Sequence, residues 1–228
     1  IGNSRTATLL FSSLLASGVT NTRISLSASY KHPTVVDSDL GSGSLRTTDL
    51  GLNYKNRIEE LAREWSLFPV ASSFALAQRG APKPVLPEKN LRIICGSFDS
   101  QYVEHLLRDG QDHFFIGRAP GHVATVGPFV QPGSTPCRRC LSLIEADRVG
   151  VAELSIPLGT SDELPIAIAH QVAALAAHAA LKYIDTGKSE LQAAQLIVDF
   201  LDALNPTLQR FPQHPECECL WTSPDVLI

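Results

Sequence analysis

The sequence contains no methionine and no run of basic residues. Its 19 lysines and arginines are spread over 228 residues, and the formal net charge is −4. Proteins that bind nucleic acid need a positive patch that neutralises phosphates, so we do not expect a nucleic-acid partner. A chain of average composition and this length would contain several methionines. We therefore expect that an N-terminal segment, and short internal stretches as well, are missing from this sequence.

A long apolar run without polar residues is also absent. The longest candidate, residues 165–184, is dominated by alanine and contains four polar side chains: His170, Gln171, His178 and Lys182. It falls short of a membrane span. Residues 5–16 combine one arginine with a short apolar stretch, which fits either a signal peptide or a crossover helix. We favour the helix and a cytoplasmic protein, because the cysteine pattern described below suits a reducing compartment.

Apolar residues make up 44% of the chain and charged residues 18%, which is typical of a globular protein. Strand-like and helix-like segments alternate, and this order predicts an α/β fold. We expect a Rossmann-like, mostly parallel sheet with helices on both faces and a zinc-pinned C-terminal part. We divide the chain into a Rossmann-like domain over residues 1–120 and a C-terminal part over residues 121–228.

The apolar spacing also predicts the individual elements. We predict helices over residues 5–17, 58–65 and 100–108, and a long helix ending at Asp185. We predict strands over residues 22–28, 91–95, 113–117 and 123–130, and an antiparallel pair over 194–200 and 207–211. Gly18 and Gly187 are predicted helix C-caps, and Thr160 with Glu163 is a predicted capping box. The Gly- and Ser-rich residues 37–51 predict a long loop.

Four of the five cysteines fall into two short motifs, Cys137-Arg138-Arg139-Cys140 and Cys217-Glu218-Cys219. Two such motifs from distant parts of a chain supply four thiolates for a tetrahedral Zn²⁺. We predict a structural zinc ion that joins the C-terminal tail to the middle of the chain, with the adjacent arginines offsetting the thiolate charge. Disulfides or a redox CxxC pair are the alternatives. The fifth cysteine, Cys95, is interpreted as a buried core thiol.

The histidines offer no general base with an orienting partner. His170 and His178 can share one face of the long helix, and we interpret them as core or interface residues. His113 and His122 flank a strand and are candidates for lining a cleft. His214 precedes the second cysteine motif and is expected to shape that turn.

A degraded nucleotide motif opens the chain. Gly2-x-Ser4-x-x-Ala7 occupies the place of GxGxxG, with serine and alanine at the second and third glycine positions. Residues 25–29 contain no carboxylate that could hold ribose hydroxyls. We therefore predict that nucleotide binding is weak or lost.

Four segments together resemble the ThiF-like, ubiquitin-activating-type superfamily. The resemblance is strongest to its cyclodehydratase-partner branch, from bacteriocin and thiazole/oxazole-modified peptide biosynthesis. Two segments are general: residues 2–5 with 15–19, and residues 48–51 with Arg57. Two are more specific: residues 127–140, which end in the first cysteine motif, and residues 214–219, which contain the second.

The resemblance implies a usually dimeric α/β protein with a zinc-pinned C-terminal part. Active adenylating members of the family carry a glycine-rich loop, an acidic cluster after the second strand, and an Arg and a Lys that contact ATP phosphates. Here Gly2 and Ser4 mark the loop, and Arg46, Lys55 or Arg57 would stand in for the basic residues. In the cyclodehydratase-partner branch, the ThiF-like protein binds or presents the precursor peptide while a YcaO-type partner uses ATP to form azolines.

The first hypothesis is therefore a ThiF-like scaffold that assists azoline formation on a ribosomal precursor peptide without binding ATP. The second is an ATP-dependent adenylyltransferase that activates the C-terminal carboxylate of a peptide or carrier protein. The third is a nicotinamide-dependent oxidoreductase built on the same Rossmann-like start.

Overall fold

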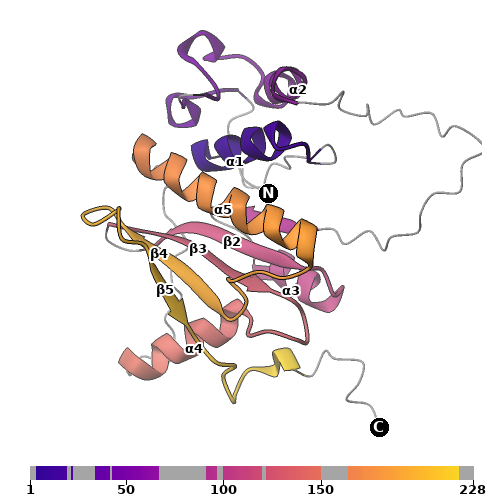
Figure 1. Cartoon of the computed structure of the whole chain (residues 1–228), viewed down its shortest axis with the longest axis vertical. Coiled ribbons are helices and arrows are strands. Elements are labelled where there is room, and N and C mark those ends of the chain that lie inside the picture. Colours follow the sequence, from indigo (N-terminus) through magenta and orange to yellow (C-terminus); the bar gives the residue numbers. More distant parts are fainter. Residues whose placement is uncertain are drawn as a thin grey trace, which may run out of the picture.

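A five-stranded sheet forms the centre of the computed structural model (Figure 1). The structure describes residues 4–19, 22, 34–41, 43–66, 91–96, 100–119, 122–149 and 164–220. The strands are β1 (Arg92–Cys95), β2 (His113–Ala119), β3 (Val123–Val130), β4 (Ala194–Asp199) and β5 (Thr207–Arg210). They lie in the order β1-β2-β3-β4-β5. The sheet thus takes strands from both predicted segments, residues 1–120 and 121–228.

The α/β class is confirmed, but the expectation of a mostly parallel sheet is wrong for the described strands. Only β1 and β2 pair in parallel, and the other three pairs are antiparallel. The connections explain two of the three antiparallel pairs, β2–β3 and β4–β5. Helix α3 (Ser100–Arg108) carries the chain from β1 to β2, whereas the short loops after β2 and β4 permit only antiparallel neighbours. The strand predicted over residues 22–28 lies outside the described residues, apart from Thr22.

Helices cover both faces of the sheet, as predicted (Figure 1). On one face lie α1 (Arg5–Ala16) and α5 (Ile166–Thr186), and on the other lie α3 and α4 (Arg138–Val149). Helix α2 (Tyr54–Trp65) packs on the far side of α1 and forms an outer layer. None of the described helices combines the length and the apolar content that a membrane span requires.

The main core lies between α1, α5 and the sheet. The buried face of α5 is made largely of alanines at helical spacing: Ala169, Ala173, Ala176, Ala177 and Ala180. These short side chains let the α5 backbone approach its neighbours closely. The sheet presents larger side chains toward this helix, with Phe114, Val126 and Phe129 fully buried. A second apolar cluster on the opposite face joins β1 and β2 to α3 and to the cysteines.

Helix ends follow the capping rules. The Ser4 hydroxyl accepts the Ala7 N–H at 3.2 Å and caps the start of α1. At its other end Gly18 adopts a φ of +90°, and a Schellman pair of hydrogen bonds closes the helix. Gly187, with a φ of +69°, ends α5 in the same left-handed conformation. The predicted capping box at Thr160 and Glu163 lies outside the described residues.

The described residues 37–41 and 43–51 belong to the predicted loop and contain two short 3-10 turns, Asp37–Asp39 and Thr47–Asp49. In each turn an aspartate carboxylate accepts the backbone N–H three residues earlier. Asp39 binds Val36 at 3.0 Å, and Asp49 binds Arg46 at 2.8 Å. These local bonds give the loop a defined path beside α1 without regular secondary structure.

A buried hydrogen bond joins α1 to the outer layer. The Tyr54 hydroxyl lies 2.9 Å from the Thr8 hydroxyl, and both side chains are fully buried. We expect Tyr54→Phe to lower the free energy of unfolding by about 1–1.5 kcal/mol, because Thr8 loses a buried partner. Urea denaturation followed by circular dichroism measures the change.

Tyr102→Phe on α3 is the matched control, since Tyr102 is half-buried and lies away from the contact between α1 and α2. It should change the free energy by less than about 0.5 kcal/mol. Equal losses in the two variants would contradict a structural role for the Tyr54–Thr8 bond.

Candidate functional site

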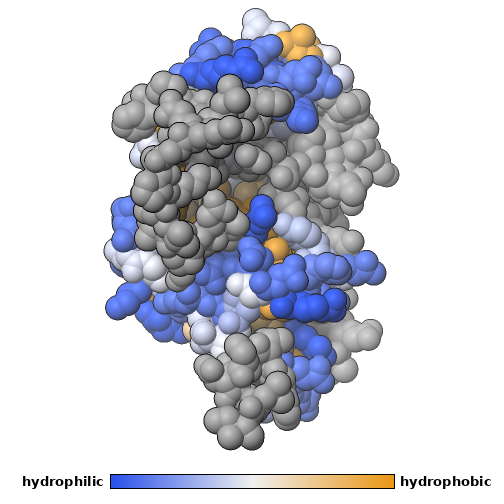
Figure 2. All heavy atoms as spheres, turned by 90° about the vertical axis from the view of Figure 1, so that its right-hand side faces the viewer, coloured by the Kyte–Doolittle hydropathy of each residue, from blue (hydrophilic) through white to orange (hydrophobic). Residues whose placement is uncertain are grey.

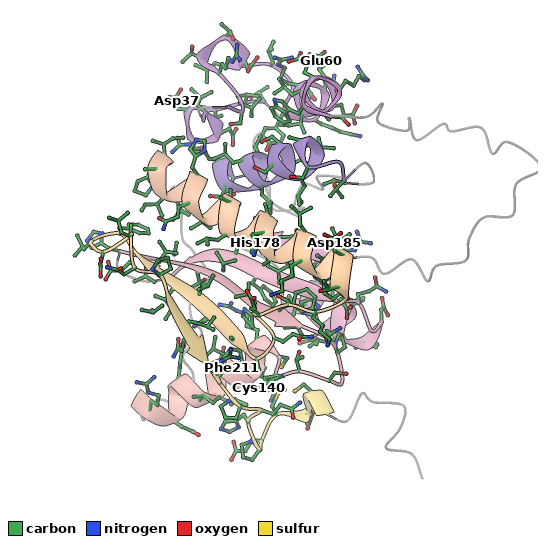
Figure 3. The ribbon with its side chains drawn as sticks, in the orientation of Figure 1. Asp37, Glu60, Cys140, His178, Asp185 and Phe211 are labelled. Atoms are coloured by element: carbon green, nitrogen blue, oxygen red, sulfur yellow. The ribbon has the colours of Figure 1, made fainter. Side chains whose placement is uncertain are left out.

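Two distant segments bring the four cysteines together below the sheet. Strand β3 ends at Val130, and a turn in which the Thr135 hydroxyl accepts the Gln131 N–H at 2.9 Å leads into Cys137. Helix α4 begins at Arg138 and carries Cys140 in its first turn. Cys217 and Cys219 come from the C-terminal tail, at the 3-10 turn Glu218–Leu220. Figure 3 shows Cys140 where the tail passes α4.

The four sulfur atoms have the spacing of a metal site. The Sγ–Sγ distances are 4.0 Å for Cys137–Cys140, 3.5 Å for Cys137–Cys217 and 3.5 Å for Cys140–Cys219. All four sulfurs lie within 4.8 Å of one another. A tetrahedron with metal–sulfur bonds of about 2.3 Å has edges of about 3.8 Å. The residues therefore fit a single four-coordinate metal ion.

Disulfides are the wrong interpretation of these motifs. All five cysteines are free thiols, and the closest sulfurs are far beyond the disulfide bond length of about 2.05 Å. The CxxC motif does start a helix after a strand, as in redox proteins. A redox CxxC needs no second pair of cysteines. Here Cys217 and Cys219 converge on the CxxC motif, and this distinguishes the cluster from a redox site.

The cysteine thiols differ in how easily they ionise. A hydrogen bond with Cys140, together with burial, raises the pKa of the Cys137 thiol, and burial raises the pKa of Cys219 to about 12. The hydrogen bond from Cys137 lowers the pKa of Cys140 to about 4. One sulfur ionises readily, but further thiolates at this spacing repel one another. A bound cation would offset this repulsion and stabilise the thiolates.

His214 holds the second cysteine motif in place, as predicted. Its Nδ1 accepts the Glu216 N–H at 3.1 Å, and its carbonyl oxygen accepts the Cys217 N–H at 3.0 Å. With Nδ1 an acceptor, Nε2 carries the proton and donates to the Asp147 carboxylate at 2.9 Å. Asp147 is the residue that sequence reasoning missed. It lies 67 residues from His214 on α4, a helix that the sequence did not predict because its amphipathic pattern is weak.

The arginines beside Cys137 do not have equivalent surroundings. The Arg138 guanidinium lies over the Phe115 ring, 5.3 Å from its centroid, and burial lowers the pKa of Arg138 to about 10. Arg139 is exposed. The backbone N–H of His214 donates to the Cys140 sulfur. This hydrogen bond stabilises the Cys140 thiolate and lowers the pKa of Cys140.

The residues expected to contact a nucleotide are mostly engaged elsewhere. Gly2 lies outside the described residues, and the Ser4 hydroxyl caps α1. Arg57 donates to Asp49 at 2.7 Å and to Glu60 at 3.1 Å, and the hydrogen bond to Asp49 raises the pKa of Arg57. Lys55 is exposed and lies 4.0 Å from Glu59. Arg46 is exposed and lines an open groove.

A small cavity lies beside the N-terminal end of α1. Its volume is about 10 Å³, enough for one water molecule, and Ser4, Thr6 and Cys95 line it. Cys95 is buried, as predicted, with 5% of its surface exposed. The Thr6 hydroxyl is buried and has no hydrogen-bond partner within the described part of the chain. Arg5 closes this end by donating to the carbonyl oxygens of Leu40 and Leu164.

The remaining histidines form no site in the described structure. His113 is fully buried, donates from Nδ1 to the Gln111 carbonyl oxygen at 2.8 Å, and packs edge-on against Phe115. The prediction that it lines a cleft is therefore wrong, and burial lowers its pKa. His122 is exposed and contacts the Phe200 ring edge-on. His170 and His178 are exposed, so they are not core residues, and their interpretation as interface residues stays a prediction.

No protein-family model and no curated protein matches the chain. Several solved structures, however, have a similar fold. E. coli MccB with ATP aligns over 97% of this chain and 65% of that chain, with a TM-score of 0.60 and 15% identity. MccB with AMPCPP and selenomethionine MccA aligns over 96% and 65%, with a TM-score of 0.60 and 15% identity. This chain shares the fold of MccB.

A third structure is that of the microcin C7 biosynthetic enzyme MccB in complex with N-formylated MccA. It aligns over 77% of this chain and 54% of that chain, with a TM-score of 0.53 and 15% identity. The chain thus spans less than two thirds of the length of the MccB chains it matches. At this identity the likeness concerns the fold.

The cysteine cluster gives a direct metal prediction. We expect elemental analysis of the purified protein to find about one metal ion per chain. Cys217→Ser removes one of four sulfur ligands, so the variant should lose the metal and unfold at a lower temperature in calorimetry.

Cys95→Ala is the matched control, because Cys95 is buried but lies outside the cluster. This variant should lose some stability and keep its metal. A metal-free wild-type protein with the same stability as Cys217→Ser would contradict the metal site.

Proposed function

We propose that this chain is a ThiF-like scaffold that assists azoline-forming cyclodehydration of a ribosomal precursor peptide, without binding ATP itself. A YcaO-type partner would supply the ATP-dependent chemistry. Two findings support the peptide-modifying context: the chain shares the fold of MccB, and MccB has been solved with MccA. The free thiols suit the reducing cytoplasm, where we place the protein.

The observation that carries the scaffold proposal is that Arg57 and Ser4, which would hold phosphates, are already bound to other groups of the protein. Arg57 is held by Asp49 and Glu60, and Asp49 is 97% buried, so moving Arg57 onto a phosphate would leave a buried carboxylate unpaired. The Ser4 hydroxyl already accepts a backbone N–H. The small cavity lined by Ser4 and Thr6 accommodates a water molecule rather than a triphosphate.

The metal in this proposal is a structural Zn²⁺ held by Cys137, Cys140, Cys217 and Cys219. Four thiolates at tetrahedral spacing are the donor set that zinc prefers, and they leave no position for a reactive water. The ion would join the C-terminal tail to α4 and keep the lower face of the sheet closed. Its charge would be shared with backbone N–H groups.

The second candidate is an ATP-dependent adenylyltransferase acting on a C-terminal carboxylate. It is favoured by the likeness to MccB solved with ATP. In that case Arg46, which is exposed beside an open groove, would be the basic residue best placed to reach a phosphate.

ATP binding separates the two candidates. We expect isothermal titration calorimetry of the folded, metal-loaded protein to detect no ATP binding. We also expect ATP–pyrophosphate exchange at the background rate, with or without a precursor peptide. Exchange that depends on a peptide and is lost in Arg46→Ala would instead establish the adenylyltransferase.

Reconstitution tests the scaffold itself. Adding this protein to a YcaO-type enzyme, its precursor peptide and ATP should accelerate the loss of water from the peptide by about tenfold or more, because a scaffold raises the local peptide concentration. Mass spectrometry follows the reaction. The Cys95→Ala variant, with its metal site intact, should retain this effect. An unchanged rate on adding folded wild-type protein would contradict the scaffold role.

A further inference from the structure

Few residues of the C-terminal tail are buried. Between Phe211 and Cys219, only His214 and Cys217 are buried in the described structure. In Figure 1 the tail runs toward the right-hand side of the molecule, and the described residues on that side are mostly hydrophilic (Figure 2). The tail therefore buries few side chains against the rest of the protein, and His214 and Cys217 anchor it.

The backbone of His214 joins the two cysteine motifs. Its carbonyl oxygen accepts the Cys217 N–H at 3.0 Å, and its own N–H donates to the Cys140 sulfur. Cys140 belongs to α4, whereas Cys217 belongs to the tail. The position of the His214 backbone thus sets how closely the sulfurs of the tail approach the sulfurs of the first motif.

The side chain of His214 contacts α4 a second time. Cys140 and Asp147 are seven residues apart on α4, which is almost two full turns, so they lie on the same face of the helix. His214 contacts Cys140 with its backbone N–H and Asp147 with Nε2, 2.9 Å from the carboxylate. One residue of the tail therefore spans two turns of α4, and this fixes both its position and its orientation.

The protonation of the imidazole makes Asp147 its necessary acceptor. Nδ1 of His214 accepts the Glu216 N–H at 3.1 Å, so the proton lies on Nε2 and points out of the tail toward α4. His214 is only 7% exposed. Without the Asp147 carboxylate, a buried N–H donor would lose its partner.

The local preferences of α4 do not favour an aspartate at position 147. Aspartate is a poor residue for a helix interior, and Asp147 lies in the last turn of α4, where the helix dipole repels negative charge. Its side chain is 71% exposed, and an ion pair with so exposed a member contributes little stability. Its hydrogen bond to His214 therefore serves to position the tail rather than to stabilise the fold.

We propose that Asp147 and His214 are positioning residues that hold the tail cysteines on the metal and set how slowly the metal leaves. This rests on the zinc ion of the proposed function and on no part of its peptide chemistry. Hydrogen bonds around a metal site orient the ligands, and losing one typically costs about 10- to 100-fold in metal affinity. The metal leaves when the two tail cysteines separate from the first pair, and the His214–Asp147 bond opposes that separation.

Metal release measures this role. The full chain is loaded with Zn²⁺ and mixed with an excess of a chromogenic chelator, and absorbance follows the release. Asp147→Ala should release zinc about tenfold faster than the wild-type protein. Asp147→Asn should release it at nearly the wild-type rate, because an amide oxygen also accepts the Nε2–H. Arg148→Ala, at the exposed neighbouring position on α4, is the matched control and should leave the rate unchanged.

A double-mutant cycle shows whether the two side chains act together. His214→Asn keeps an acceptor for the Glu216 N–H, but its shorter side chain does not reach Asp147. It should accelerate release about as much as Asp147→Ala does, and the double variant should release zinc no faster than either single variant. With Co²⁺ in place of Zn²⁺, the absorption bands of tetrahedral thiolate coordination should persist in every variant, which shows that each still folds around the four sulfurs.

Three outcomes would overturn the positioning role while the zinc ion stands. They are an unchanged release rate in Asp147→Ala, release from Asp147→Asn as fast as from Asp147→Ala, and additive effects of the two substitutions in the double variant. A wild-type protein that takes up neither Zn²⁺ nor Co²⁺ would overturn the zinc ion itself, and the positioning role with it.

Discussion

The convergence of four cysteine sulfurs is the constraint on which the lower half of the structure depends. Cys137 and Cys217 are 80 residues apart, yet their sulfurs lie 3.5 Å from each other. This contact holds the C-terminal tail against α4, and α4 against the strand that precedes it. Within the cluster, the pKa of Cys137 is raised while that of Cys140 is lowered, and a bound cation would stabilise the thiolates together. The fold and the proposed zinc ion therefore support each other.

The upper half of the molecule depends on different contacts. Helix α1 is capped by Ser4, tied to α2 through Thr8 and Tyr54, and tied to the loops through Arg5. In a nucleotide-binding protein the start of such a helix faces phosphate. Here the side chains of Ser4 and Arg5 are bound to other groups of the protein, although the buried Thr6 hydroxyl has no hydrogen-bond partner within the described residues. This contrast between a retained cysteine cluster and a closed helix terminus is the physical basis of the scaffold proposal.

Much of the local structure could be predicted from the sequence. Ser4 and the two glycines after α1 and α5 mark helix ends because capping is decided by the residue and its immediate neighbours. The strand Val123–Val130, the helix Ser100–Arg108 and the β4–β5 pair follow from apolar periodicity. The metal ligands could be named because their spacing in each motif reflects how a short turn places two sulfurs on one ion.

The sequence by itself determined most of the described helices and strands, though not α4, the glycines that end α1 and α5, and which four sulfurs can share a metal. Each depends on interactions within a few residues. The tertiary structure alone decided that most of the sheet is antiparallel, that His214 pairs with Asp147, and that Arg57 is held by Asp49. It also decided that Leu201 and Leu204 face solvent. Pairing and burial depend on which distant segments meet, and local spacing carries no information about that.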